Sequence, residues 1–532
     1  MTAPGVFTPY STLQPFFPAS KPSWIPDELD QERILSYQIY EQIYWNAPDT
    51  FKLVARGTED KPIYIPSGRI IVEATNRFTA PGFGFAVLPA VPGTQPKPGV
   101  IDTAQAFFKA FFVRERFFSK FAANKRSGLI HGDWLWHIVA DPTKPQGSRV
   151  SIHALDPGSY FPIPHPNDLD RILGCHIVEQ FIPPGETDAV IKRTTYRKSD
   201  ADLVSPPGGP ITVEVGIFEL DDWGGPESKA KQILRPLQQV PGITSLPVYH
   251  VRNFEEPGNP FGSSEMRGLE RVIAAVNQGI SDEELTLALE GLGMYATDAP
   301  TPVDDDGNEI DWVLGPGKVV EHPLLAGGKG FYRVNGVGSV APMQDHLKYI
   351  EDKLKEASGV PDVAAGRVSV TVAESGISLS LQLAPMIAKT DEKDTILREI
   401  HDQMFYDLAT QWFPTYEGAR FDGLTVMSTI GDKMPVDREK RFVELNDMLD
   451  RQVISAAYYR LEAAKFGYVF PEGLGEDVVQ EKAAMAVAQD PFALRSLDEV
   501  GADDGSSTGQ QPTTDSISNG SGQVGSGIGG SA

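Results

Sequence analysis

Apolar residues recur at helical spacing in the first quarter of the chain. In residues 27–45, Leu35, Ile39 and Ile43 follow one another at intervals of four, and tyrosines widen the same face. This spacing predicts an amphipathic helix. Residues 103–125 carry a wide phenylalanine face with charges elsewhere, which predicts a second helix buried in a core.

Short runs of β-branched and aromatic residues predict strands. The run at 63–72 is interrupted by Pro66-Ser67-Gly68, a turn signal, so two short strands are expected there. Further strands are predicted at 134–140, 150–155, 171–181, 211–220 and 424–428. Helices and strands that alternate irregularly up to about residue 258 indicate an α+β unit.

A helix, a hairpin and a second helix form the most informative pattern. The first helix is expected at 264–288, with a weak polar middle at 277–279 and a capping box at Ser281 that restarts it. Asp306-Gly307, in a glycine-rich stretch, predicts a β-hairpin.

The second helix of this pattern is expected at 343–358. Its end is predicted by Ser358-Gly359-Val360-Pro361, because glycine favours the C-terminal cap and proline cannot continue a helix. A long helix at 375–413 follows, kinked at Pro385.

The two ends of the chain have different compositions. Residues 1–26 are rich in proline and aromatic residues, which favours an extended arm draped over a neighbour. Helices are expected at 437–449, 455–465 and 475–488. From residue 501 the chain is almost only small and polar, so the tail is predicted to be disordered.

Composition restricts the class of protein. The chain has 532 residues, which implies two or more structural units. Its net charge is -25, which favours solubility and repels phosphate backbones. A single cysteine, Cys175, excludes an intrachain disulfide and implies a reducing compartment or a disulfide-free secreted protein. Neither a signal peptide nor a transmembrane helix is expected.

Motifs of catalysis are incomplete or misplaced. The lysines at 318 and 329 lack the full phosphate-loop spacing, and the GxSxG at 505–509 lies in the tail. No HExxH occurs, and the acidic run at 304–307 does not fit a calcium loop. We therefore expect no catalytic residue, no metal and no cofactor, and a structural protein rather than an enzyme.

Three groups of residues, in order, carry a resemblance to a known family. The first runs from Gly262-Ser263-Ser264-Glu265 through a helix with Asn277-Gln278 to Ser281-Asp282, and ends at 358–361. The second is 375–379 with 383–386 and Lys389, and the third is 434–438 with 453–455. In this order and spacing, roughly residues 30 to 485 resemble the portal proteins of long-tailed bacteriophages.

The resemblance implies an α+β portal fold with wing, stem, clip and crown. By position it divides the chain as follows: 1–29 N-terminal arm, 30–260 wing, 261–290 stem helix, 291–340 clip, 341–361 stem helix, 362–374 tunnel loop, 375–414 kinked long helix of the wing, 415–495 C-terminal wing and crown helices, and 496–532 disordered tail.

The resemblance also implies a function and a set of partners. A portal forms a ring, usually of twelve copies, at one vertex of the capsid, and its channel passes double-stranded DNA without sequence specificity during packaging and ejection. The implied partners are the terminase large subunit, a head-completion or neck adaptor, the major capsid protein and the scaffolding protein. Such a chain would be found in the virion, and in the host cytoplasm during assembly.

Candidate site residues follow from the same positions. The tunnel-loop candidates are Arg367, Ser369, Thr371 and Glu374. The candidates for the lumen of the stem are Glu351, Asp352 and Glu356, which could instead pair with cations of a neighbouring subunit. The candidates for docking at the clip are Asp304, Asp305, Asp306, Gly307 and Asn308. The alternatives to a portal are another phage neck or baseplate protein, or a cytoplasmic hydrolase of unrecognised type.

Overall fold

The computed structural model divides the chain into two compact units, Met1–Met434 and Pro435–Ala532. It describes residues 24–47, 50–51, 53, 62–91, 99–185, 187–199, 208–292, 294–297, 307–309, 331–334, 340–367, 376–434, 438–451 and 459. In the second unit, helix α9 (Arg438–Asp450) agrees with the helix predicted at 437–449. The helices predicted at 455–465 and 475–488, the tail and most of the N-terminal arm lie outside the described residues.

Helix α1 (Glu28–Trp45) confirms the first predicted helix. The Asp27 carboxylate accepts a hydrogen bond from the backbone N–H of Leu29 at 2.8 Å, which satisfies one of the free donors at the start of the helix. The predicted apolar face is buried. Asn46, in the left-handed conformation, ends the helix one residue after Trp45.

The single helix predicted at 103–125 is wrong, because the phenylalanine face belongs to two helices. Helix α3 (Val100–Arg114) and helix α4 (Phe117–His131) are separated by Arg116, whose φ of 54° places it in the left-handed region. Apart from the exposed Phe118, the phenylalanines nevertheless belong to the predicted core. They pack there with strand residues around 134–138 and helical residues around 397–413. Phe83 and Phe121, for example, stack with their ring centres 4.1 Å apart.

The strands predicted at 63–72 are also wrong. Residues 62–66 are irregular, and helix α2 (Ser67–Phe78) begins directly after Pro66. Proline is tolerated at the start of a helix because the missing N–H would have no partner there. Ile71 and Val72 are buried in a core with α1 and α4, so packing overrides their preference for strands.

Two antiparallel sheets make up most of the described β-structure. One has the strand order β3-β2-β9, and the other has the order β4-β5-β6-β7-β8, while β1 and β12 form a separate pair. The five predicted strands outside 63–72 correspond to β2, β3, β5, β7 and β12. The bounds are β1 Gly84–Pro89, β2 Asp133–Ala140, β3 Val150–Leu155, β4 Tyr160–His165, β5 Asp168–Phe181, β6 Val190–Arg197, β7 Thr212–Glu219, β8 Gln232–Gln239, β9 Val248–Arg252 and β12 Leu424–Thr429.

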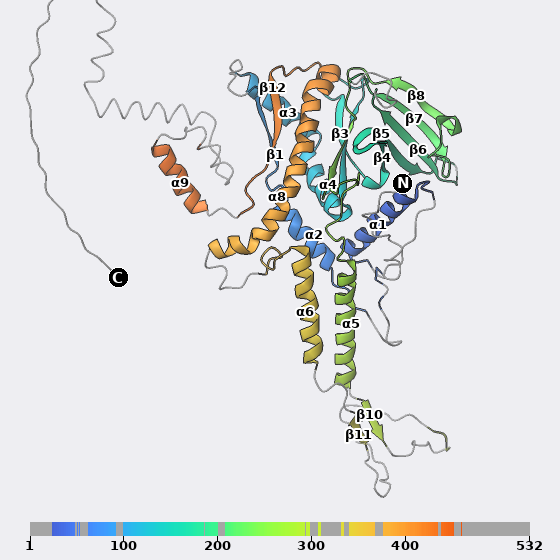
Figure 1. Ribbon diagram of the computed structural model, residues 1–532, viewed down its shortest axis with the longest axis vertical. Coiled ribbons are helices and arrows are strands. Elements are labelled where there is room, and N and C mark those ends of the chain that lie inside the picture. The colour runs from blue at the N-terminus through green and yellow to red at the C-terminus, as the bar shows by residue number, and fades with distance from the viewer. Residues whose placement is uncertain are drawn as a thin grey trace, which may run out of the picture. The chain divides into compact units, whose positions relative to one another are not determined.

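Helices α5 (Glu270–Leu292) and α6 (Ala341–Ser358) leave the sheets and the other helices of the first unit side by side (Figure 1). Beyond their far ends, β10 (Met294–Thr297) pairs with β11 (Phe331–Val334). The apolar runs at 312–314 and 318–320, which follow the predicted Asp306-Gly307 turn in the sequence, lie outside the described residues. The predicted helix–hairpin–helix order is thus present, although the described hairpin pairs residues further apart in the chain than Asp306-Gly307 alone would require.

Helix α8 (Gly376–Asp407) is the long helix predicted after residue 375. Pro385 lies within it, and the ribbon bends along its length (Figure 1). A π-helical segment (Leu408–Glu417) continues from it before β12. None of the described helices is both long enough and apolar enough to cross a membrane.

Candidate functional site: the helix pair α5/α6 and its base

Helices α5 and α6 run antiparallel and are joined by both apolar and polar contacts. A Cβ atom on Gly279 would lie 3.2 Å from Leu347 Cδ1, so the glycine lets the two helices approach closely. One turn further along, Gln344 Nε2 donates to Glu283 Oε1 at 2.8 Å. The contacts between the two helices therefore extend over more than one turn.

The polar middle of α5 binds another part of the chain. The Asn277 side chain accepts a hydrogen bond from the backbone N–H of Ile65 at 2.7 Å, and Ser281 Oγ accepts one from the backbone N–H of Ile63 at 2.9 Å. The weak middle and the restart at Ser281 were wrong predictions, because α5 is continuous from Glu270 to Leu292. The polar residues serve the backbone of the irregular segment 62–66 instead of interrupting the helix.

A buried cluster of charges lies at the base of the helix pair. We call Glu265, Lys389, Lys393 and Asn253 the Glu265 cluster. The Glu265 side chain is fully buried and forms ion pairs of 2.5 Å with Lys389 and with Lys393, both from α8. Asn253 Nδ2 also donates to Glu265 Oε1 at 3.0 Å, and its own carbonyl side-chain oxygen accepts from Lys393 at 2.8 Å.

The Glu265 cluster remains ionised although it is buried. Burial raises the pKa of the Glu265 carboxyl, but the charges of Lys393 and Lys389 outweigh this effect and lower it to about 2. Lys389 Nζ additionally donates to the backbone carbonyl of Ser358 at 2.8 Å, at the last residue of α6. A single lysine of α8 therefore contacts both Glu265, in the segment before α5, and the end of α6.

A second cluster lies on the same turns of α8. We call Lys433, Asp391, Asp394 and Thr390 the Lys433 cluster. Lys433 Nζ lies 2.8 Å from Asp391 Oδ1, 2.7 Å from Asp394 Oδ2 and 2.9 Å from Thr390 Oγ1. Asp394 also accepts a hydrogen bond from the backbone N–H of Ala80 at 2.7 Å.

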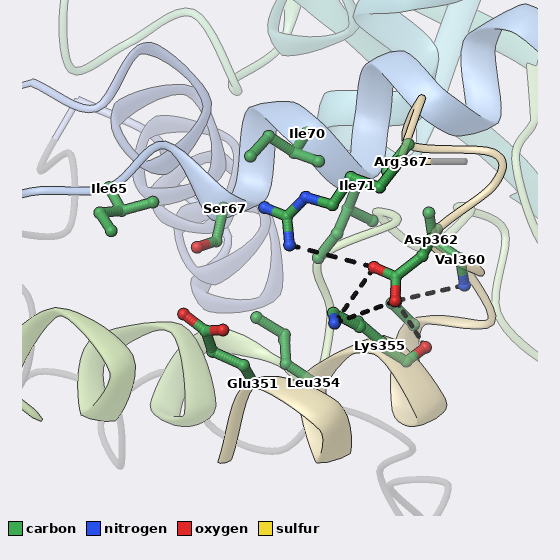
Figure 2. Close-up of a pocket in the computed structure, with 12 residues that line it drawn as sticks. Ile65, Ser67, Ile70, Ile71, Glu351, Leu354, Lys355, Val360, Asp362 and Arg367 are labelled. Carbon is green, nitrogen blue, oxygen red and sulfur yellow. Dashed lines mark hydrogen bonds and ion pairs between the residues drawn. The ribbon is translucent and has the colours of Figure 1, made fainter. Parts of the chain in front are cut away.

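A pocket of about 110 Å³ opens between α2, the end of α6 and the segment that follows it (Figure 2). Ile70, Ile71 and Leu354 form part of its apolar lining. Figure 2 shows Asp362 between two cations: Lys355 Nζ lies 3.1 Å from Asp362 Oδ1, and Arg367 Nη1 lies 3.9 Å from the same oxygen. Asp362 is thus paired with the two cations at the edge of this pocket.

The predicted tunnel-loop and lumen residues are partly described. Arg367 is exposed at the edge of the pocket, which Glu351 also lines. Asp352 lies 3.3 Å from Lys355 and Glu356 lies 2.6 Å from Lys353, so both acids pair with lysines of their own helix. Whether the three acids face a lumen stays a prediction. Ser369, Thr371 and Glu374 lie outside the described residues.

Little of the predicted clip is described. Gly307 has a φ of 85°, the left-handed conformation that a turn at this position requires, and Asn308 is exposed. Asp304, Asp305 and Asp306 lie outside the described residues. Docking at these residues stays a prediction.

Sequence reasoning did not identify the two clusters as sites. Glu265 and Lys389 stand in the motifs that carry the family resemblance, but they are 124 positions apart and no local pattern pairs them. Glu265 follows Ser263-Ser264 and Lys389 precedes Thr390-Asp391, and a charged residue among polar neighbours usually indicates an exposed position.

Metal-ligating side chains and the single cysteine of the described residues can be considered in turn. Among them, no group of three or more histidine, cysteine or acidic side chains is placed to hold a metal ion. Burial raises the pKa of the Cys175 thiol to about 12, which keeps it protonated and unreactive. The described site consists of a helix pair with a cluster of paired charges at its base.

No family model and no curated protein matches the sequence. Among solved structures, the chain is similar to one described as "Virion of native gene transfer agent (GTA) particle", with 13% sequence identity and a TM-score of 0.41. The match covers 83% of this chain and 95% of the other. A similarity at this level assigns neither a fold family nor a function.

Proposed function

We propose that the chain is the subunit of a portal, a ring at one capsid vertex whose channel admits and releases double-stranded DNA. One observation carries the proposal: two antiparallel helices project together from an α+β unit and carry a β-paired insertion at their far ends (Figure 1). The helices begin after Gly262–Glu265 and end at 358–361, which are the residues that resemble portal proteins.

The dimensions of the helix pair suit this role. At 1.5 Å per residue, the 18 residues of α6 span about 27 Å. A helix of this length can form a section of channel wall. The insertion beyond it would dock the terminase large subunit during packaging and a neck adaptor afterwards, while the α+β part would contact the capsid and scaffolding proteins.

The charge of the chain suits a channel that does not retain DNA. Twelve copies would carry about -300 (12 × -25) in total, before counterions are considered. Strong binding of phosphates by lysine and arginine would slow the movement of DNA, and its affinity would depend steeply on salt. An acidic ring would avoid both effects.

Imaging of the assembled protein tests the proposal. The full chain is purified, incubated at assembly concentrations and reconstructed by cryo-electron microscopy. We expect a closed ring with an axial hole that α5 and α6 surround. A ring with the helix pair on its outer surface would contradict the channel function, and a protein that stays monomeric at all concentrations would favour the hydrolase alternative.

Labelling in particles separates a portal from other virion proteins. A gold-labelled tag on the chain is expected at one capsid vertex of tailless heads. A label found only on tails or baseplates would favour the neck or baseplate alternative.

A further inference from the structure

The Glu265 and Lys433 clusters both include side chains from the same short stretch of helix α8, on two of its faces. Lys389 and Lys393 are four residues apart and so share one face of the helix. At about 100° per residue, Asp391 and Asp394 lie on a different face, well over a quarter turn away. The side chains of 389–394 thus connect α8 to the base of the helix pair on one side and to the segment around Lys433 on the other.

The two clusters connect α8 to distinct parts of the chain. On one side, Lys389 reaches both Glu265 (2.5 Å) and the Ser358 carbonyl (2.8 Å) at the end of α6. On the other, Lys433 stands at the end of the first unit, just before Pro435, and pairs with Asp391 and Asp394. These contacts are separated in sequence by more than 70 residues from Ser358 to Lys433, but by only one and a half turns along α8.

We propose that residues 389–394 of α8 couple the segment around Lys433 to the end of α6. Weakening the contacts of either cluster then weakens the contacts of the other. Lys389 and Lys433 act as positioning residues in this device. The physical basis is that both clusters depend on the same backbone turns of α8. A buried ion pair is stable only if both of its side chains are fixed in position. The bend at Pro385 lies just before these turns. The contacts of the two clusters therefore also fix the direction that α8 takes after the bend.

The coupling is reciprocal, because linkage between two sites acts equally in both directions. It belongs to the single chain and does not depend on ring formation. Its failure is therefore distinguishable from the failure of the proposed portal function.

Hydrogen exchange of the full-length protein, followed by mass spectrometry, tests the coupling. In Lys433→Met, we expect faster exchange in a peptide covering 430–434 and also in the distant peptide covering 354–360, by about fivefold or more at the distant site. In Lys389→Met, exchange should also become faster in both peptides, but the larger increase is expected at 354–360. An effect of Lys433→Met confined to 430–434 and α8 would overturn the proposal.

Two further variants protect the test. Lys353→Met removes the exposed pair with Glu356 on α6 and serves as the matched control, because it should leave 430–434 unchanged. Should Lys433→Met fail to fold, Asp391→Asn removes only one of the two carboxylates that hold Lys433, and Asp391 is 64% exposed. We expect a smaller acceleration at 354–360 in this variant, and no change there would equally overturn the coupling.

Discussion

Glu265 shows how a single side chain can fix a junction without adding much net stability. Taking a carboxylate and two ammonium groups out of water is costly, and their attraction only roughly offsets that cost. Lys389 and Lys393 must both be held in place for the carboxylate to remain ionised. Because breaking such a cluster leaves an uncompensated buried charge, its geometry tolerates little change.

Replacement of Glu265 by glutamine should destabilise the protein strongly. The neutral amide leaves the buried Lys393 and the half-buried Lys389 without their counter-charge. Loss of one partner of a buried pair typically costs about 3–5 kcal/mol. Glu356→Gln, which removes an exposed partner of Lys353, should change the stability little. The measurement is the free energy of unfolding in urea, and equal effects of the two substitutions would contradict the role of the cluster.

The same carboxylate should make the protein sensitive to acid. Its pKa is about 2 in the folded protein and near 4.5 when unfolded, so the stabilisation is fully present above about pH 4.5. It is lost as the pH falls from 4.5 towards 2, because the unfolded chain then binds the proton more readily. The slope of stability against pH in this window should be shallower in Glu265→Gln than in the native protein.

At the scale of elements, local signals predicted what local interactions determine. The end of α6 was predicted at Ser358, and Gly359 does adopt the left-handed conformation that ends the helix. The break between α3 and α4 was missed, because it depends on the backbone of Arg116 and leaves the phenylalanine spacing intact. Helix α2 was missed because its β-branched residues favour strands, whereas their burial against other helices decides the outcome.

The polar middle of α5 was recognised but misinterpreted for the same reason. Asn277 and Ser281 were expected to weaken or interrupt the helix. Instead, they accept hydrogen bonds from the backbone N–H groups of Ile65 and Ile63, more than 200 positions away. A pattern along the chain indicates that a polar residue is unusual in a helix. It does not indicate which distant backbone group that residue will bind.

Substitution of Asn277 by alanine should therefore weaken the contact between α5 and residues 62–66. The backbone N–H of Ile65 would lose its acceptor in a partly buried place, which typically costs about 1–3 kcal/mol. Gln278→Ala, one position along the same helix, removes a hydrogen bond to Asp282 within the helix and should cost less. Exchange of the amide at residue 65, measured in both variants, should rise only in Asn277→Ala.

At the scale of the whole molecule, the acidic charge acquires a meaning only if the subunits assemble. On one chain, a net charge of -25 is an ordinary soluble surface. In a ring, the effect depends on which acids line the channel. On α6, Asp352 and Glu356 are 57% and 71% exposed and pair with lysines of the same helix, so reversing them converts paired sites into a net positive surface.

Charge reversal on α6 is thus the sharpest test of the channel at this scale. Glu351, Asp352 and Glu356 are replaced together by lysine, which would change the proposed ring of twelve copies by about +72 charges (12 × 6). DNA moving through the proposed channel should then be retained by its phosphates. We expect less DNA packaged per head, with the defect relieved as salt screens the new charges.

A matched reversal separates the channel from general charge effects. Glu179, Glu219 and Asp222 are also exposed acids paired with lysines, but they belong to the five-stranded sheet and the segment after β7. Their replacement by lysine adds the same charge to the chain and should leave packaging near the native level, because these positions are not expected in the channel. Equal defects in both triple variants, or normal packaging in both, would remove α6 from the path of the DNA.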